Sequence, residues 1–459
     1  MRHDSNKIFD ADNQSKKIKV LESDLKDQPK QEEPEFVHRD GGWGWLVVLC
    51  TGYCFGILIG MCNNYALIYV ELERVYIGTD NHVTYAGWIG SMSVGIQYIF
   101  CVFGSILIDL FTPLKIGLLG GIISTLSLFS CAFVEKLTVY FFTYGLLFGI
   151  GQSFLLASTL SILPHYFDKR LSLANGIMNL IGSIIIVILP IFTSIIINAY
   201  GLKTTFFFLT ALNAVPIFLV MSFKSRLPKP KDLTLKKELK NSLGIDVLRK
   251  KMFVAWCFIT FIGKFGYFIP ILNIDHYAKL TFPDKPPVIV NVVFSTFAGI
   301  AGIAFGKLGD YTIKYFNHVH YHTFVYIAYG IVQIFIPFAT DYTSFMIQIV
   351  ILGIIDGILL AFIVPISVDL VGSSKLGNQA IGYYHISMSA TSIAGPAVAG
   401  KIYEIYKSYD IAFYIGGITS LFAGLIMVIL YLIIDHYENK KLKVNEQVKL
   451  NQINKIVGF

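Results

Sequence analysis

Residues 344–370 read SFMIQIVILGIIDGILLAFIVPISVDL, an almost continuously apolar run with the acidic residue Asp356 near its middle. An α-helix rises 1.5 Å per residue, so about 20 residues cross the hydrocarbon core of a bilayer, which is about 30 Å thick. Because this run is longer than that, it predicts a membrane-spanning helix. Asp356 would then lie deep in the membrane, where a charged group is costly and is by default assigned a function.

Eleven further runs on both sides of this one meet the same requirement. They lie near residues 43–70, 84–108, 114–134, 138–164, 171–197, 203–223, 252–275, 288–309, 323–340, 380–404 and 411–434. The composition agrees, since 54% of the residues are hydrophobic and 15% are charged, whereas soluble domains carry about 25% charged residues. The sequence therefore predicts an all-α membrane protein with twelve transmembrane helices. It excludes a soluble enzyme and a nucleic-acid-binding protein.

The formal net charge of +7 is concentrated between the sixth and seventh spans, where ten Lys and Arg residues face three acidic residues. Cytoplasmic loops carry an excess of basic residues, so this stretch and both termini are predicted to be cytoplasmic. The chain then divides into a disordered tail, a six-helix half, a basic loop, a second six-helix half and a second tail. These parts cover residues 1–39, 40–223, 224–251, 252–434 and 435–459.

The loops after the second and eighth spans repeat one pattern. The first reads Ser105-Ile106-Leu107-Ile108-Asp109 and the second reads Gly306-Lys307-Leu308-Gly309-Asp310. An acid that merely ends a helix would explain one copy, but two copies at matching places resemble the G-x-L-a-D loop of the major facilitator superfamily. The resemblance implies the twelve-helix fold of that superfamily, with Asp109 and Asp310 holding the cytoplasmic gate closed.

Two other stretches carry a closer resemblance. Asp40-Gly41-Gly42-Trp43-Gly44-Trp45 opens the first span and is similar to the [D/E]-G-G-[W/F]-G-W signature of the monocarboxylate transporter family. Residues 166–176 read YFDKRLSLANG and resemble the second signature of that family, with the basic pair Lys169 and Arg170. The branch that carries aromatic amino acids and iodothyronines is the most similar. The resemblance implies signature or gating roles for Asp40, Trp43, Trp45, Lys169 and Arg170.

The substrate residues of this family are largely replaced. Its lactate carriers use a Lys in span 1 and an Asp-x-x-x-Arg pair in span 8, and the matching residues here are Asn63, Ala298 and Gly302. Its aromatic branch uses His residues in spans 1 and 7, where this chain has Cys62 and Asn273, and an acid in span 10, which is retained as Asp356. Proton coupling is therefore doubtful.

Lys264 is a second charged residue inside a predicted span. Lys264 and Asp356 each lie about 18 Å from the start of their helices, which enter from opposite faces, so both fall near the middle of the membrane. We predict that they form the charged core of the substrate site, with Lys264 taking an anionic group and Asp356 holding it in the empty state. Asn63, Asn273 and Gln152 would add hydrogen bonds. A purely structural ion pair is the alternative.

The expected function is secondary transport of a small organic anion or carboxylate-bearing metabolite by alternating access. The alternatives are a facilitative carrier of aromatic amino acids or iodothyronines and a substrate sensor that does not transport. The six cysteines form no CxxC pair and no cluster at metal-ligand spacing, so no metal or other cofactor is expected. The expected partners are the substrate, the lipid bilayer and, as the resemblance implies for some members, a single-span immunoglobulin-like glycoprotein. The plasma membrane is the expected location.

Overall fold

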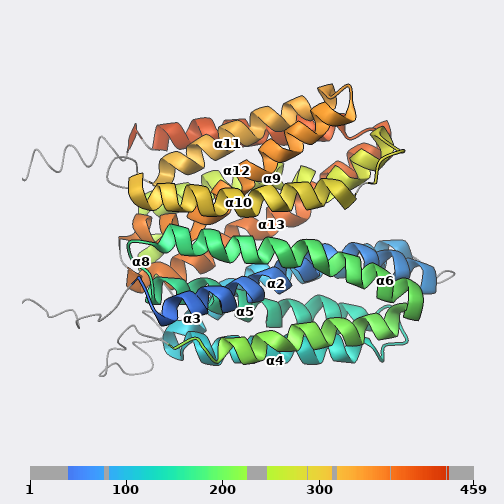
Figure 1. Ribbon diagram of the computed structural model, residues 1–459, viewed down its shortest axis with the longest axis horizontal. Helices are drawn as coiled ribbons and strands as arrows, with labels where there is room; N and C mark the ends of the chain where they lie inside the picture. The colour runs from blue at the N-terminus through green and yellow to red at the C-terminus, as the bar shows by residue number, and fades with distance from the viewer. Residues whose placement is uncertain are drawn as a thin grey trace, which may run out of the picture. The chain divides into compact units, whose positions relative to one another are not determined.

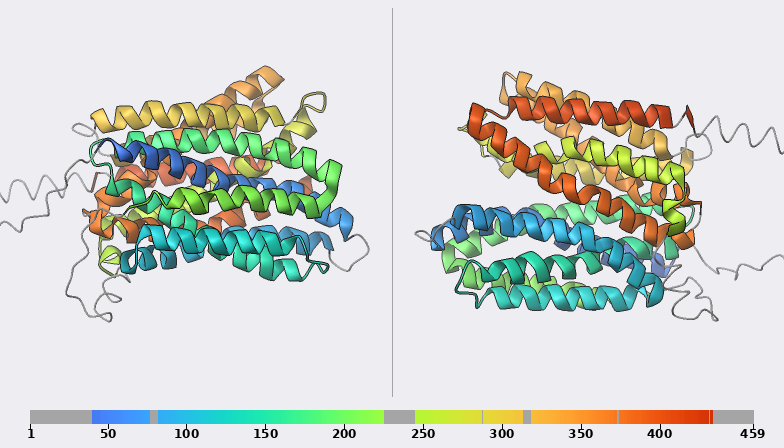
Figure 2. Two further views of the ribbon diagram at one scale, coloured as in Figure 1. Left: turned by 60° about the horizontal axis from the view of Figure 1, so that its bottom comes forward. Right: turned by 180° about the vertical axis from the view of Figure 1, so that it is seen from behind.

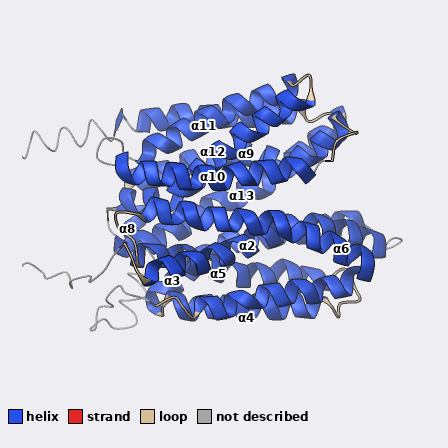
Figure 3. Cartoon of the chain, in the orientation of Figure 1, coloured by secondary structure: helices blue, strands red, loops and turns tan. Residues whose placement is uncertain are grey.

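The computed structural model describes residues 40–76, 82–224, 245–286, 288–312, 318–372, 374–430 and 432–433, all within one compact unit that covers residues 40–459. These residues are helical nearly throughout and include no strand (Figure 3). The predicted tails 1–39 and 435–459, together with most of the basic loop 224–251, lie outside the described residues.

The helices follow one another along the described residues (Figure 1). The first half of the described chain contains α2 (Trp43–Val75), α3 (His82–Leu110), α4 (Pro113–Cys131), the π-helix η1 (Phe141–Phe148), α5 (Gly149–Ile162), the 3-10 helix η2 (Leu163–His165) and α6 (Leu171–Val220). The second half contains α8 (Ile245–Leu248), α9 (Lys251–Thr281), α10 (Val288–Thr312), α11 (His318–Phe335), η3 (Ile336–Phe338), α12 (Tyr342–Val371), α13 (Ser374–Tyr406) and a last helix, Asp410–Leu430.

Ten helical stretches among the described residues are long and apolar enough to cross a membrane. One of them, α6, contains two crossings, because Gly201 interrupts it with a φ of 75° and a ψ of −175° that only glycine adopts readily. The less apolar helix α13 has 33 residues, which is long enough for one more membrane crossing. The described residues therefore confirm the predicted all-α architecture of twelve crossings, including the break between the fifth and sixth.

Local signals in the sequence explain where α12 begins and ends. The carboxylate of Asp341 accepts hydrogen bonds from the backbone N–H groups of Thr343 (3.0 Å) and Ser344 (3.1 Å), which is a typical helix N-cap. Gly372 ends the helix with a φ of 69°, the left-handed conformation that favours glycine. The two caps set the ends of α12 and leave Asp356 near the middle of the helix.

The two halves contact each other most extensively along two pairs of helices. α6 lies beside α10, and α3 lies beside α13, as the views in Figure 1 and Figure 2 show from several sides. Glycines allow the first pair to approach closely, because a Cβ atom at Gly176 would collide with the carbonyl oxygen of Gly302. The second pair is similarly tight where Gly382 faces Ser105. Contact along these pairs leaves the faces of α9 and α12 that carry Lys264 and Asp356 inside the molecule.

Candidate functional site

Lys264, Tyr267 and Asp356 form a buried cluster in the second half of the chain. The side chains of Lys264 and Asp356 are only 1% and 5% exposed. The ammonium nitrogen of Lys264 lies 3.3 Å from the centroid of the Tyr267 ring and 5.9 Å from that of Phe268. The hydroxyl of Tyr267 donates a hydrogen bond of 2.5 Å to Oδ1 of Asp356. Tyr267 therefore connects the cation to the acid.

Lys264 and Asp356 do not form a direct ion pair. Among the described residues, side-chain nitrogen and oxygen atoms meet within 4.0 Å between Arg74 and Glu71 and between Arg249 and Asp246, but not between these two. The reason lies in the helix geometry: residues three apart on a helix share a face, so the ring of Tyr267 packs beneath the Lys264 side chain. The carboxylate of Asp356 then bonds to the hydroxyl of that ring.

Close helix packing fixes both sides of this cluster. On α9, a Cβ atom at Gly266 would collide with the carbonyl oxygen of Gly416, so α9 is pressed against the last helix. On α12, a Cβ atom at Gly357 would collide with the carbonyl oxygen of Ala298 on α10. Glycine is required at such approaches because any side chain would separate the helices. The cluster is thus held on two rigidly packed helices.

Aromatic side chains surround the charged groups. Tyr329 donates a hydrogen bond of 3.1 Å to the carbonyl oxygen of Tyr267, and the two rings lie 5.3 Å apart. His385 on α13 contacts the carbonyl oxygen of Ile381 through Nδ1 at 2.7 Å. Its ring lies 5.8 Å from that of Tyr98, which belongs to α3 in the first half. The histidine therefore lies at the contact between the two halves.

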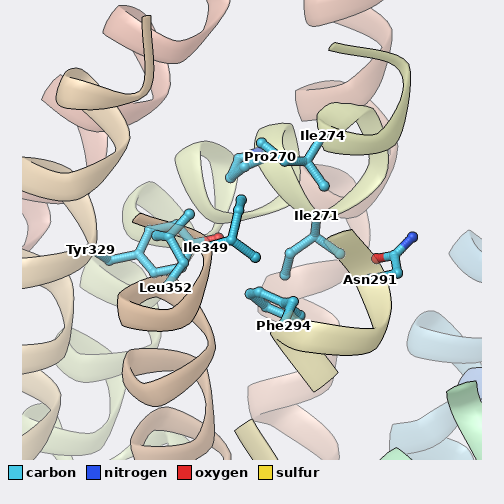
Figure 4. Close-up of a pocket in the computed structure, with 8 residues that line it drawn as sticks. All are labelled: Pro270, Ile271, Ile274, Asn291, Phe294, Tyr329, Ile349 and Leu352. Carbon is cyan, nitrogen blue, oxygen red and sulfur yellow. The ribbon is translucent and has the colours of Figure 1, made fainter. Parts of the chain in front are cut away.

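A small apolar pocket lies one helical turn from Asp356 (Figure 4). Tyr329 lines this pocket as well as bonding to the backbone of Tyr267, so the pocket adjoins the charged cluster. Its remaining lining comes from Pro270, Ile271, Ile274, Asn291, Phe294, Ile349 and Leu352. The charged cluster thus has an apolar region next to it on the same helices.

The other three predicted substrate residues have their described contacts elsewhere. Gln152 donates a hydrogen bond of 2.9 Å to Asn213 inside the first half. Asn273 bonds to the carbonyl oxygen of Ile269 on its own helix at 2.9 Å, and Asn63 is exposed on α2. None of these contacts involves Lys264 or Asp356.

The two predicted gate acids each join one half of the molecule to the other. Asp310, at the end of α10, accepts hydrogen bonds from the backbone N–H groups of Ser172 (3.0 Å) and Leu173 (2.9 Å) at the start of α6. Asp109, at the end of α3, accepts hydrogen bonds from the side chains of Asn378 and Gln379 on α13, at 2.9 and 2.8 Å. The repeated sequence pattern therefore corresponds to a repeated contact.

The two signature stretches lie against each other. The carboxylate of Asp40 bonds to the backbone of Asp168, Lys169 and Arg170, while the side chains of those three residues are exposed. The indole of Trp43 donates to the carbonyl oxygen of Ser222 at 3.2 Å. The ring of Trp45 meets that of Phe167 edge-on, with centroids 4.9 Å apart. Both signatures therefore build one structure at the start of α2.

The sequence did not indicate a role for Tyr267, which is the residue that links the two charges. The available signal was its position three residues after Lys264 on the same predicted helix. The chain contains 26 tyrosines, however, so this spacing alone does not single one out.

Comparisons with known proteins agree with the fold. The family model described as Major Facilitator Superfamily matches residues 46–372 and 289–456. Among solved structures, the human organic anion transporter MFSD10 (TETRAN) is 12% identical, with a TM-score of 0.63 over 84% of this chain and 98% of that one. A variant of the E. coli fucose:proton symporter FucP gives a TM-score of 0.62 at 12% identity, with the same coverage. The predicted superfamily fold is confirmed.

Curated relatives extend along most of the chain. Monocarboxylate transporter 10 of Rattus norvegicus is 28% identical over 419 residues, which cover 87% of this chain and 80% of the relative. The Danio rerio protein of the same name is 29% identical with the same coverage. Monocarboxylate transporter 2 of Mus musculus is 22% identical over 88% of this chain and 87% of the relative. The resemblance to monocarboxylate transporters that the signatures predict is thereby confirmed.

Proposed function

The chain belongs to the major facilitator superfamily, and from this premise we propose that it moves a small organic anion across the membrane by alternating access to one central site. The observation that carries the proposal is the setting of Lys264. Its buried ammonium contacts aromatic rings, and the nearby carboxylate of Asp356 takes its hydrogen bond from Tyr267. Lys264 is therefore the group that would receive a substrate anion.

The energetics support this assignment. Burying a charge without a partner costs several kcal/mol, and a direct ion pair would offset much of that cost. The cation–π contact with Tyr267 offsets a smaller part, about 2 kcal/mol where the ammonium is desolvated. A carboxylate that reaches Lys264 would supply the missing counter-charge. Binding of an anion is thus favoured over binding of a cation.

The contacts of Asp109 and Asp310 support the proposal of alternating access. Both acids hold the two halves together at the end of the molecule where the chain enters α6 and α13. We propose that the halves, residues 40–223 and 252–434, move as units and that these bonds break when the site opens toward the cytoplasm. The same contacts re-form when the site opens to the other side.

The replaced residues of span 8 support a proposal for the energy source. At the positions where lactate carriers hold their acid and arginine of span 8, this chain has Ala298 and Gly302. We therefore propose facilitated transport, with the substrate gradient as the driving force. A basic central loop supports cytoplasmic termini, and we place the protein in the plasma membrane, with a single-span immunoglobulin-like glycoprotein as the candidate accessory subunit.

Uptake of labelled lactate, pyruvate, a ketone body, an aromatic amino acid and an iodothyronine into oocytes tests the proposal. At least one of these carboxylates should enter faster than in uninjected cells, and Lys264→Ala should remove the difference. Lys203→Ala is the matched control, because Lys203 also lies over an aromatic ring, at 5.3 Å from the Phe133 centroid, but is exposed. Binding of a carboxylate at the cell surface without uptake would favour a sensor.

The aromatic surroundings of the site favour a second candidate within the same panel. Rings of Tyr267, Phe268 and Tyr329 lie around the charged groups. Flat substrates stack on such rings, with a gain of about 0.5–1.5 kcal/mol for each good pair. A preference for the aromatic amino acid or the iodothyronine over lactate would identify this facilitative carrier.

A further inference from the structure

Asp40 binds three consecutive backbone N–H groups of the segment that precedes α6. Its Oδ1 accepts from Asp168 at 3.0 Å and from Arg170 at 3.1 Å, and its Oδ2 accepts from Lys169 at 3.3 Å. The backbone N–H of Asp40 in turn donates to the carbonyl oxygen of Tyr166 at 2.8 Å. Asp40 is thus bonded to both ends of one short stretch of chain.

The next two backbone N–H groups along the chain that bind a carboxylate donate to a different acid. Ser172 and Leu173 donate to Asp310, at 3.0 and 2.9 Å. Residues 168–173 therefore give five backbone N–H groups to two acids, of which Asp40 belongs to the first half and Asp310 to the second. Only Leu171 separates the last amide bound by Asp40 from the first bound by Asp310. The amides bound by Asp40 and those bound by Asp310 therefore belong to one continuous stretch of backbone.

The position of Asp40 is itself fixed. Its φ is 75°, which non-glycine residues rarely adopt, and Gly42 follows with a φ of 56°. The next turn of α2 is anchored by the indole of Trp43 on Ser222. A Cβ atom at Gly44 would lie 3.1 Å from the Phe167 ring. An unusual backbone conformation at a polar residue persists only where the surroundings hold it.

We propose that Asp40 is a positioning residue of the cytoplasmic gate: it holds residues 168–170 so that the N–H groups of Ser172 and Leu173 point at Asp310. The inference rests on the proposed role of Asp310 in closing that gate. Asp40 and the segment it binds both belong to the first half, so their contacts stay in place during opening. Only the bonds to Asp310 break. They re-form readily because the N–H groups of Ser172 and Leu173 keep their orientation.

Hydrogen exchange on the purified full-length protein in nanodiscs tests this without knowledge of the substrate. Asp310→Ala should speed exchange at Ser172 and Leu173 about fivefold, the usual size for loss of a helix cap, and leave residues 168–170 protected. Asp40→Gly removes the carboxylate and tolerates the φ of 75°, and it should speed exchange at both groups of amides by a similar factor. Faster exchange at residues 168–170 alone would overturn the proposal, because Asp40 would then act only locally.

The matched control is Asp341→Ala, which removes a comparable cap on α12. It should leave exchange across residues 168–173 unchanged. If Asp40→Gly does not fold, Asp40→Glu moves the carboxylate while keeping its charge, and the two groups of amides are compared in the same way. Because the readout is exchange and not uptake, loss of transport in the Lys264 variant and loss of this coupling are separate results.

Discussion

The ammonium of Lys264 lies over the ring of Tyr267, 3.3 Å from its centroid, and not beside an acid. The hydroxyl of the same tyrosine binds Asp356. Tyr267 thus contacts both charged groups: the face of its ring lies against the ammonium, and its hydroxyl binds the carboxylate. A substrate carboxylate that approached Lys264 would not have to displace Asp356 from the ammonium. This separates the binding of an anion from the breaking of an ion pair.

Tyr267→Phe tests the two roles of the tyrosine separately. The substitution keeps the ring under Lys264 but leaves the buried carboxylate of Asp356 without this donor, which costs about 1–3 kcal/mol of the free energy of unfolding. We expect a lower melting temperature in detergent and reduced uptake. Tyr326→Phe is the control, because Tyr326 is buried and its hydroxyl has no hydrogen-bond partner among the described residues. Equal melting temperatures for the two variants would contradict the bond to Asp356.

Substitution of both charged residues separates a binding role from a structural one. Lys264→Ala and Asp356→Ala should each abolish transport, because each leaves one charge buried beside Tyr267 that is no longer balanced by the opposite charge on the other side of the tyrosine. The double variant should recover surface expression, measured by biotinylation, but not uptake, because the group that binds the anion is missing. Lys264→Arg should retain some uptake with a changed apparent affinity. If the double variant transported normally, the cluster would be structural only.

The predicted orientation rests on the basic residues between spans six and seven. Tags placed at residues 10, 235 and 455 should all be protected from reagents added outside intact cells, since a cytoplasmic position of the central loop requires both termini on the same side of a twelve-span protein. Antibody staining before and after permeabilisation measures this. Surface staining of the tag at residue 235 alone would require a different arrangement of the spans.

Uptake should depend only weakly on external pH. The acid and arginine that couple protons in lactate carriers are replaced by Ala298 and Gly302, so we expect less than about a threefold change between pH 6 and pH 7.5. Initial rates of tracer uptake at the two pH values, with a fixed substrate gradient, give the ratio. Strong stimulation by acid together with proton movement would instead assign the proton to Asp356.

The sequence predicts the fold better than the site, and the reason is physical. Each crossing requires a long apolar run, and a break such as that at Gly201 stands out against it. Charges inside such runs are rare, so Lys264 and Asp356 can be recognised too. Hydrogen-bonding residues such as Gln152 are common inside spans, and their side chains can bond to any of several neighbouring helices. The sequence does not say that Gln152 bonds to Asn213, because that depends on how the helices pack.

The close contact between Gly176 and Gly302 predicts the effect of a single methyl group on the gate. A Cβ atom at Gly176 would collide with the backbone oxygen of Gly302, so Gly176→Ala must push α6 and α10 apart. Overpacking of this kind costs about 1–3 kcal/mol, which shifts a two-state equilibrium away from the closed gate by about 5- to 150-fold. We expect lower uptake and faster hydrogen exchange at Ser172 and Leu173, with normal surface expression. Gly400→Ala, in open space on α13, should change neither, and unchanged uptake and exchange in Gly176→Ala would contradict closure of the gate through this contact.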